Sequence, residues 1–174
     1  PLPGPTPHLK ESLAMTRVTI PDFASLLAPH IERVPDAALP AFLARLERSA
    51  ADRYRMWAEA LPEHAEGLLE CAAREDDIAD RVDRVYPATA PEQVAAMDSA
   101  FAPAKETYYE VFAGLTPVEQ MTIQANAERQ GAAAWRGMIE GESDDSVCVA
   151  LEECARTEEA SADYLDALLA QLNA

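Results

Sequence analysis

Basic residues are scarce in this sequence. Only 14 lysines and arginines stand against 31 aspartates and glutamates, which gives a formal net charge of −17. A field of that sign repels phosphate backbones and anionic lipid surfaces. No apolar run reaches the roughly 20 residues that a membrane-spanning helix needs, and the start lacks the charged-then-apolar pattern of a secretory leader. We therefore expect a cytoplasmic protein with no nucleic-acid partner and no membrane partner.

Aromatic residues and cysteines are also few. Aromatic residues make up 6% of the chain while hydrophobic residues make up 49%, so the core must be built mostly from Ala, Leu, Val and Ile. That composition suits closely packed helices and predicts an all-α fold. The three cysteines, Cys71, Cys148 and Cys154, form no CxxC pair. Neither a disulfide framework nor a zinc knuckle is indicated, and we expect reduced core cysteines.

Several catalytic and binding patterns are missing as well. The chain has no glycine-rich phosphate loop and no basic patch interleaved with aromatic residues. A Ser/His/Asp or Cys/His arrangement needs a histidine near the core, and the only histidines are His8, His30 and His64. The sequence therefore does not favour a hydrolase or a nucleotide-binding protein.

The length and the first residues suggest one folded unit behind a tail. A chain of 174 residues is long enough for a single domain with its own core. The first 14 residues contain four prolines, so residues 1–15 are expected to be a flexible tail or an expression remnant. Residues 16–174 are expected to form a single helical domain.

Capping residues and prolines divide this domain into helices. Asp22 can cap a short helix that runs to about Arg33. Thr116 and Glu119 form a capping box, with proline at the first helical position between them. The next predicted helix is long, begins between 36 and 40 and ends at 61, and a second long helix runs from 62 to 85. Two short helical stretches are predicted in the crossover 87–115. A third long helix is predicted from 117 to about 140, and a fourth from about 147 to 172.

The two halves of the chain resemble each other. ECAAREDDIAD at 70–80 returns as ECARTEEASAD at 153–163, with six of eleven positions identical. Tyr54-Arg55 likewise returns as Trp135-Arg136. Each half reads as a short helix followed by a long helical hairpin. Two stacked hairpins joined by a long crossover predict a four-helix bundle.

Each predicted long helix places one glutamate inside its apolar stripe. Glu47 lies 15 residues before Pro62 and Glu75 lies 13 after it, so the two face each other across an antiparallel hairpin. The second hairpin repeats this arrangement. Carboxylates in a core must be protonated, paired, hydrogen-bonded or bound to metal. The four glutamates expected to converge at one depth are Glu47, Glu75, Glu128 and Glu158.

This pattern resembles the di-iron carboxylate bundles of the ferritin-like superfamily, particularly the rubrerythrin-like branch. In those bundles two helices carry a single Glu, and the other two carry Glu-x-x-His. The corresponding stretches here are Ala72-x-x-Glu75-x-x-Ile78-Ala79 and Ala155-x-x-Glu158-x-x-Ser161-Ala162, while Glu47 and Glu128 match the single-Glu helices. The resemblance spans about residues 36–172. It implies a di-metal centre of iron or manganese with a redox or metal-handling role.

The chain departs from the family at both histidine positions, which are Ile78 and Ser161. Ligation by oxygen alone suits harder ions such as manganese, magnesium or calcium better than an imidazole-tuned iron pair. Two functions therefore remain open. One is a metal-binding ferritin-like protein. The other is a non-catalytic, degenerate ferritin-like bundle without a cofactor, acting as a structural or protein-interaction module. Its glutamates would be satisfied by Tyr54, Trp135, arginines or water, and a homodimer would form through the crossover and N-terminal helices.

Overall fold

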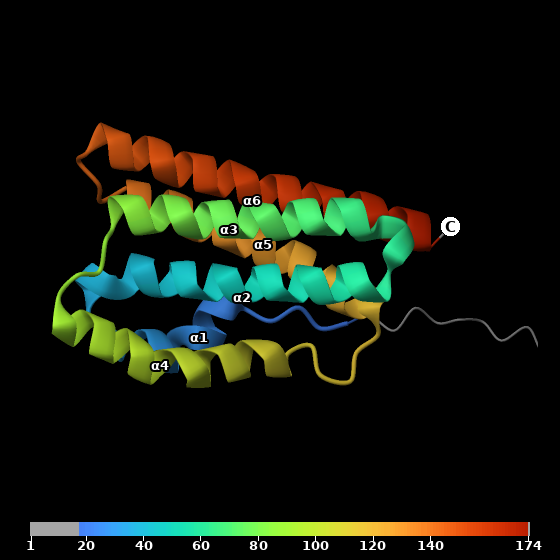
Figure 1. The fold of residues 1–174 in the computed structure, drawn as a ribbon, viewed down its shortest axis with the longest axis horizontal. Coiled ribbons are helices and arrows are strands. Elements are labelled where there is room, and N and C mark those ends of the chain that lie inside the picture. The colour runs from blue at the N-terminus through green and yellow to red at the C-terminus, as the bar shows by residue number, and fades with distance from the viewer. Residues whose placement is uncertain (1–17, 174) are drawn as a thin grey trace, which may run out of the picture.

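The computed structural model describes residues 18–173, which fold into helices and contain no strand (Figure 1). The predicted all-α class is confirmed for this part of the chain. The tail expected at residues 1–15 lies outside the described residues. The six α-helices are α1 (Phe23–Ile31), α2 (Leu39–Ala60), α3 (Ala65–Val85), α4 (Pro91–Glu110), α5 (Pro117–Ile139) and α6 (Asp145–Leu172). Short 3-10 turns at Asp36–Ala38 and Pro62–His64 precede α2 and α3.

Three of the helices start at capping residues. Asp22 accepts a hydrogen bond from the backbone N–H of Ser25, and the predicted capping box of Thr116 and Glu119 is present in both directions. The fourth long helix starts two residues before the predicted position. Asp144 caps it by accepting from the backbone N–H groups of Ser146 and Val147.

The crossover differs from the prediction. It contains one helix, α4, rather than two short stretches, although Pro103 lies inside it. An interior proline removes one backbone hydrogen bond and costs ~3 kcal/mol. The helix continues because its buried residues recur every three or four positions and pack into the core. These residues are Met97, Ala100, Ala104 and Tyr108. The second half is therefore preceded by a 20-residue helix and not by a short one.

The long helices pack as two antiparallel pairs. Helix α2 packs against α3, α5 packs against α6, and the pairs meet along α3 and α6. Helices α1 and α4 pack against each other, and α4 also contacts α2, so they lie on the side away from α6 (Figure 1). No helix within residues 18–173 combines the length and hydropathy needed to cross a bilayer.

The core of the two pairs is interrupted by a polar layer. One apolar cluster includes Tyr54, Leu68 and Met121, and another includes Ile78 and Trp135. On each long helix, the glutamate of interest lies between residues of the first cluster and residues of the second. The four glutamates therefore occupy one level of the helical assembly, with apolar side chains above and below them.

Candidate functional site

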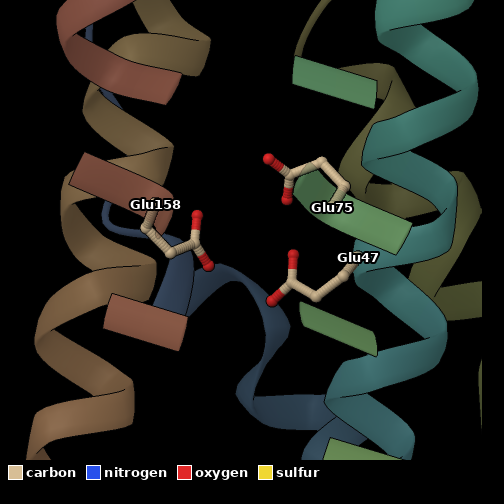
Figure 2. A group of neighbouring side chains, drawn as sticks. All are labelled: Glu47, Glu75 and Glu158. Carbon is tan, nitrogen blue, oxygen red and sulfur yellow. The ribbon is translucent and has the colours of Figure 1, made fainter. Parts of the chain in front are cut away.

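Three glutamates from three helices point toward one another at this level (Figure 2). Glu47 comes from α2, Glu75 from α3 and Glu158 from α6, and each offers a carboxylate oxygen within 4.8 Å of the others. Glu75 is 0% exposed and Glu158 is 2% exposed, while Glu47 is partly exposed. These three side chains therefore meet at one depth, as residue counting from the turns predicted.

The fourth predicted glutamate, Glu128 on α5, lies beside this group and outside its 4.8 Å limit. Its side chain is buried, and Oε1 accepts hydrogen bonds of 2.7 Å from the Tyr54 hydroxyl and 2.7 Å from Nε2 of Gln124. Glu128 is thus held by two neutral donors from α2 and α5. The negative charge of Glu128 is close enough to contribute to the raised pKa values of Glu47, Glu75 and Glu158.

The other buried glutamates have fewer partners. Oε1 of Glu158 accepts from the Trp135 indole N–H at 3.0 Å, and Oε1 of Glu75 accepts from the Ser161 hydroxyl at 3.3 Å. Oε2 of Glu75 is buried and has no hydrogen-bond partner. A buried acceptor without a donor costs free energy, so this atom is the one most in need of a proton or a cation.

Arginines do not supply that cation among the described residues. Those nearest in sequence pair with acids on the protein surface: Arg48 with Asp80 and Asp83, Arg74 with Glu70, Arg129 with Asp166, and Arg156 with Glu152 and Glu153. These pairs are partly exposed and are expected to contribute little to stability. The carboxylate cluster is left with hydrogen bonds from neutral donors only.

Burial shifts the protonation of the cluster. Desolvation, followed by the charges of Glu128 and Glu47, raises the pKa of Glu75 well above its ordinary value. Desolvation and the charge of Glu47 do the same to the pKa of Glu158. The pKa of Glu47 rises to about 8, because of desolvation and the nearby Glu128. These three carboxyl groups therefore favour holding protons more than exposed glutamates do, unless a cation takes the place of the protons.

Two residues that sequence reasoning missed help to shape the site. Gly131 on α5 leaves room for Glu158, since a Cβ at this position would lie 2.6 Å from Oε1 of that glutamate. The signal was a small residue, Ala50, at the equivalent position of the first half. Gln124, which donates to Glu128, could have been found from its i, i+4 spacing on the same face of α5.

The two positions where the resemblance expects histidine are buried in the core. Ile78 is 0% exposed and packs in an apolar cluster, while Ser161 is 0% exposed and bonds to Glu75. His30 instead hydrogen-bonds to Thr107, and His64 belongs to the 3-10 turn before α3. His8 lies outside the described residues. No described histidine belongs to the group of three glutamates.

The three-carboxylate group fits a hard divalent cation. Mg²⁺ and Ca²⁺ bind oxygen ligands at about 2.0–2.6 Å, so two oxygens on one ion lie up to about 5 Å apart. The separation of at most 4.8 Å between the glutamate oxygens falls within that limit. The donors are all oxygen, and one buried oxygen lacks a partner. These residues could hold magnesium, calcium, manganese or ferrous iron.

A cavity of about 200 Å³ adjoins the cluster, and Glu47, Glu128 and Glu158 form part of its wall. Residues 18–173 therefore form an all-α fold with a buried carboxylate site beside a cavity. No protein-family model matches the chain, and neither a curated protein nor a solved structure matches it.

Proposed function

We propose that this chain is a ferritin-like bundle protein that binds metal at the level of Glu47, Glu75, Glu128 and Glu158, with a redox or metal-handling role. The observation that carries the proposal is the buried, unpartnered Oε2 of Glu75 inside a group of three converging carboxylates. A metal ion supplies positive charge at that point. Iron or manganese would also supply the ability to exchange electrons with a bound molecule.

The packing of the long helices supports the ferritin-like assignment. Two antiparallel pairs, α2/α3 and α5/α6, are linked by a connection that contains α4. Each of the four long helices places one glutamate at the same level, as di-metal carboxylate bundles do. The absence of histidine from the group makes manganese or another oxygen-preferring ion the better match, and iron the second choice.

The surrounding residues have separable roles in this proposal. Glu47, Glu75 and Glu158 are the candidate ligands, because their oxygens converge. Trp135 orients Glu158 by donating its indole N–H to Oε1, which leaves Oε2 of that carboxylate for the ion. Glu128, held by Tyr54 and Gln124, adds negative charge beside the ion.

A degenerate, non-catalytic bundle is the second candidate, and one observation favours it. Neutral donors already serve three of the four glutamates, so protonated carboxyl groups could remain in the core without metal. In this alternative the chain kept the fold for a structural or protein-interaction role. The same structure would then owe its raised glutamate pKa values to burial alone.

Metal analysis separates the two candidates. Purified protein is treated with chelator, titrated with Mn(II), Mg(II), Ca(II) and anaerobic Fe(II), and examined by calorimetry and elemental analysis. We expect one or two equivalents of Mn(II) or Fe(II), with anomalous scattering at the glutamate level. Glu75→Gln should lose this binding.

The matched control is Glu70→Gln, because Glu70 lies on the same helix but is exposed and pairs with Arg74. It should bind metal as the unchanged protein does. Failure of every ion to bind the unchanged protein would reject the metal proposal and leave the degenerate bundle.

A further inference from the structure

The cavity beside the glutamates has a mainly apolar wall. It lies where α1, α2 and α5 meet, with Tyr108 of α4 at its edge. The apolar side chains that line it include Phe23, Leu27, Ile31, Leu43, Leu46 and Ala127. An apolar cavity of about 150 Å³ is sufficient for benzene. The volume of about 200 Å³ therefore suits one aromatic ring with a short substituent.

The side chain of Gln130 holds the start of α1 beside this cavity through two hydrogen bonds. The backbone N–H of Phe23 donates to Oε1 of Gln130 at 2.9 Å, and Nε2 of Gln130 donates to the carbonyl oxygen of Pro21 at 2.9 Å. Gln130 is on α5 and also lines the cavity. The first turn of α1, which carries the Phe23 ring, is thus tied to the helix that carries Glu128.

The polar part of the wall consists mainly of carboxyl groups, whose oxygens all become acceptors when a cation takes the place of their protons. Glu47, Glu128 and Glu158 contribute carboxylates, and none of the described lining residues is Lys, Arg or His. The donors in the wall are already engaged. Trp135 donates to Glu158, Gln124 donates to Glu128, and the Tyr108 hydroxyl donates to Gln124 at 2.7 Å. A complementary ligand must bring its own N–H donors.

The charges in the cavity wall also favour a cationic ligand. Three carboxyl groups line the cavity, and no cationic side chain lies among the described lining residues. A ligand with positive charge can take the place of a proton at these groups, whereas an anion adds a like charge beside them. An ammonium group offers three N–H donors and a positive charge in one small head, and hydrogen bonds between charged partners are the stronger kind.

We infer that this cavity binds a small primary amine whose body is one aromatic ring or a hydrocarbon chain of equal size, with its ammonium group toward Glu47, Glu128 and Glu158. The inference deepens the proposed function by naming the substrate class of the same site, and it rests on that function for the ligand's role as substrate. Binding itself needs only the cavity and the carboxylates, so it is measurable without metal.

Three ring compounds that differ in one group provide the first test. Benzylamine, benzyl alcohol and benzoate are titrated by calorimetry into chelator-treated protein and into protein loaded with Mn(II). We expect benzylamine to bind at least about ten-fold more tightly than benzyl alcohol, because hydrogen bonds that involve a charged group are stronger than those between neutral groups. Benzoate should bind more weakly than the alcohol. Equal affinity of amine and alcohol, preference for benzoate, or no binding of any ring would overturn the inference.

Matched variants locate the binding. Ala127→Leu places a larger side chain in the cavity wall and should abolish benzylamine binding. Ala133→Leu is the control, because Ala133 is exposed on the same helix and does not line the cavity. Helical circular dichroism checks that both variants fold. Benzylamine binding that survives Ala127→Leu would place the ligand elsewhere and reject the inference.

A charge variant separates the head group from the ring. Glu47→Gln should weaken benzylamine binding by about ten-fold and leave benzyl alcohol within about two-fold. Mn(II) uptake is measured independently. Amine binding without Mn(II) uptake would mean that the metal proposal fails while the amine site stands. Mn(II) uptake without amine binding would mean the reverse.

Discussion

The side-chain hydroxyl of Ser161 on α6 donates a hydrogen bond of 3.3 Å to Oε1 of Glu75 on α3. This is longer than a typical O–H···O bond, and the other oxygen of Glu75 is buried without a partner. Ser161 stands where the ferritin-like pattern expects histidine. Of the four glutamates at this level, Glu75 is thus the most deeply buried and the one with a fully buried oxygen that no donor reaches.

Replacing Glu75 with its neutral isostere should stabilise the metal-free protein. In Glu75→Gln the amide can donate toward Glu47 or Glu158, and position 75 no longer holds a buried acid that must be protonated or ionised. We expect the free energy of unfolding to rise by about 1–3 kcal/mol at pH 8 with chelator present, as measured by urea denaturation. Glu70→Gln should change it by less than about 0.5 kcal/mol. A loss of stability in Glu75→Gln would mean that the ionised or protonated acid is itself favourable there.

The metal-free protein should become less stable as the pH rises from about 6 to 8.5. In the unfolded chain a glutamate loses its proton near pH 4.5, whereas in the folded protein Glu47 keeps its proton up to about pH 8, and the pKa values of Glu75 and Glu158 are also raised well above the ordinary value. The folded state then binds more protons than the unfolded state, so the free energy of unfolding falls with rising pH.

The slope is at most about 1.4 kcal/mol per pH unit for each such carboxyl, and Glu47 contributes less because it is partly exposed. Acids with lowered pKa, such as Asp144 and Glu152, act in the opposite direction but only at lower pH. Urea denaturation at several pH values measures the slope, and Glu75→Gln should reduce it. Stability that is flat or rises over this range would contradict the raised pKa values.

The two glycines of α5 should respond to the same substitution with opposite signs. In Gly131→Ala the new Cβ would lie 2.6 Å from Oε1 of Glu158, so the carboxylate must move. We expect a loss of about 1–3 kcal/mol in the free energy of unfolding and weaker metal binding. In Gly137→Ala the Cβ meets nothing within 4 Å, and removing an interior helical glycine should add about 0.5–1 kcal/mol.

Thermal and urea denaturation of the two variants make the comparison direct, because both substitutions change helix propensity by the same amount. The difference between them isolates the contact with Glu158. Equal stabilisation by both would show that the Glu158 carboxylate has free space to move and is not fixed against α5.

Much of the helical framework could be predicted because its signals are local. Asp22 and the Thr116–Glu119 capping box mark helix starts with side chains that bond to neighbouring backbone groups. The single helix across Pro103 could not be predicted in this way. Its continuity depends on the burial of a stripe that contains Met97 and Tyr108, which is a property of the packed protein and not of the local sequence.

Part of the candidate site could likewise be predicted from local sequence, and part depends on how the helices pack. Helical periodicity placed one glutamate on each apolar stripe, and counting from the turns gave their common depth. Whether three or four of them meet depends on the distances between helices, and the structure puts Glu128 with Tyr54 and Gln124 instead of in the closest group. The cavity also arises from the position of α1, which Gln130 fixes through contacts more than a hundred residues apart in sequence.

Placing a histidine at position 161 should change the metal preference of the site. Position 161 is three residues after Glu158 and adjoins Glu75, so Ser161→His adds an imidazole nitrogen beside two of the candidate ligands. Imidazole suits iron and zinc better than magnesium or calcium. We expect tighter Fe(II) and Zn(II) binding relative to Mn(II), measured by competition titration.

The same substitution should cost stability without metal, since Ser161 is fully buried and the larger ring must be accommodated at about 1–3 kcal/mol. Ser161→Ala serves as the control, because it removes the hydroxyl bond to Glu75 without adding a ligand. The two variants should differ in metal preference. If Ser161→His and Ser161→Ala have the same metal preference, the imidazole does not reach the carboxylates. Position 161 is then not a ligand position of this cluster.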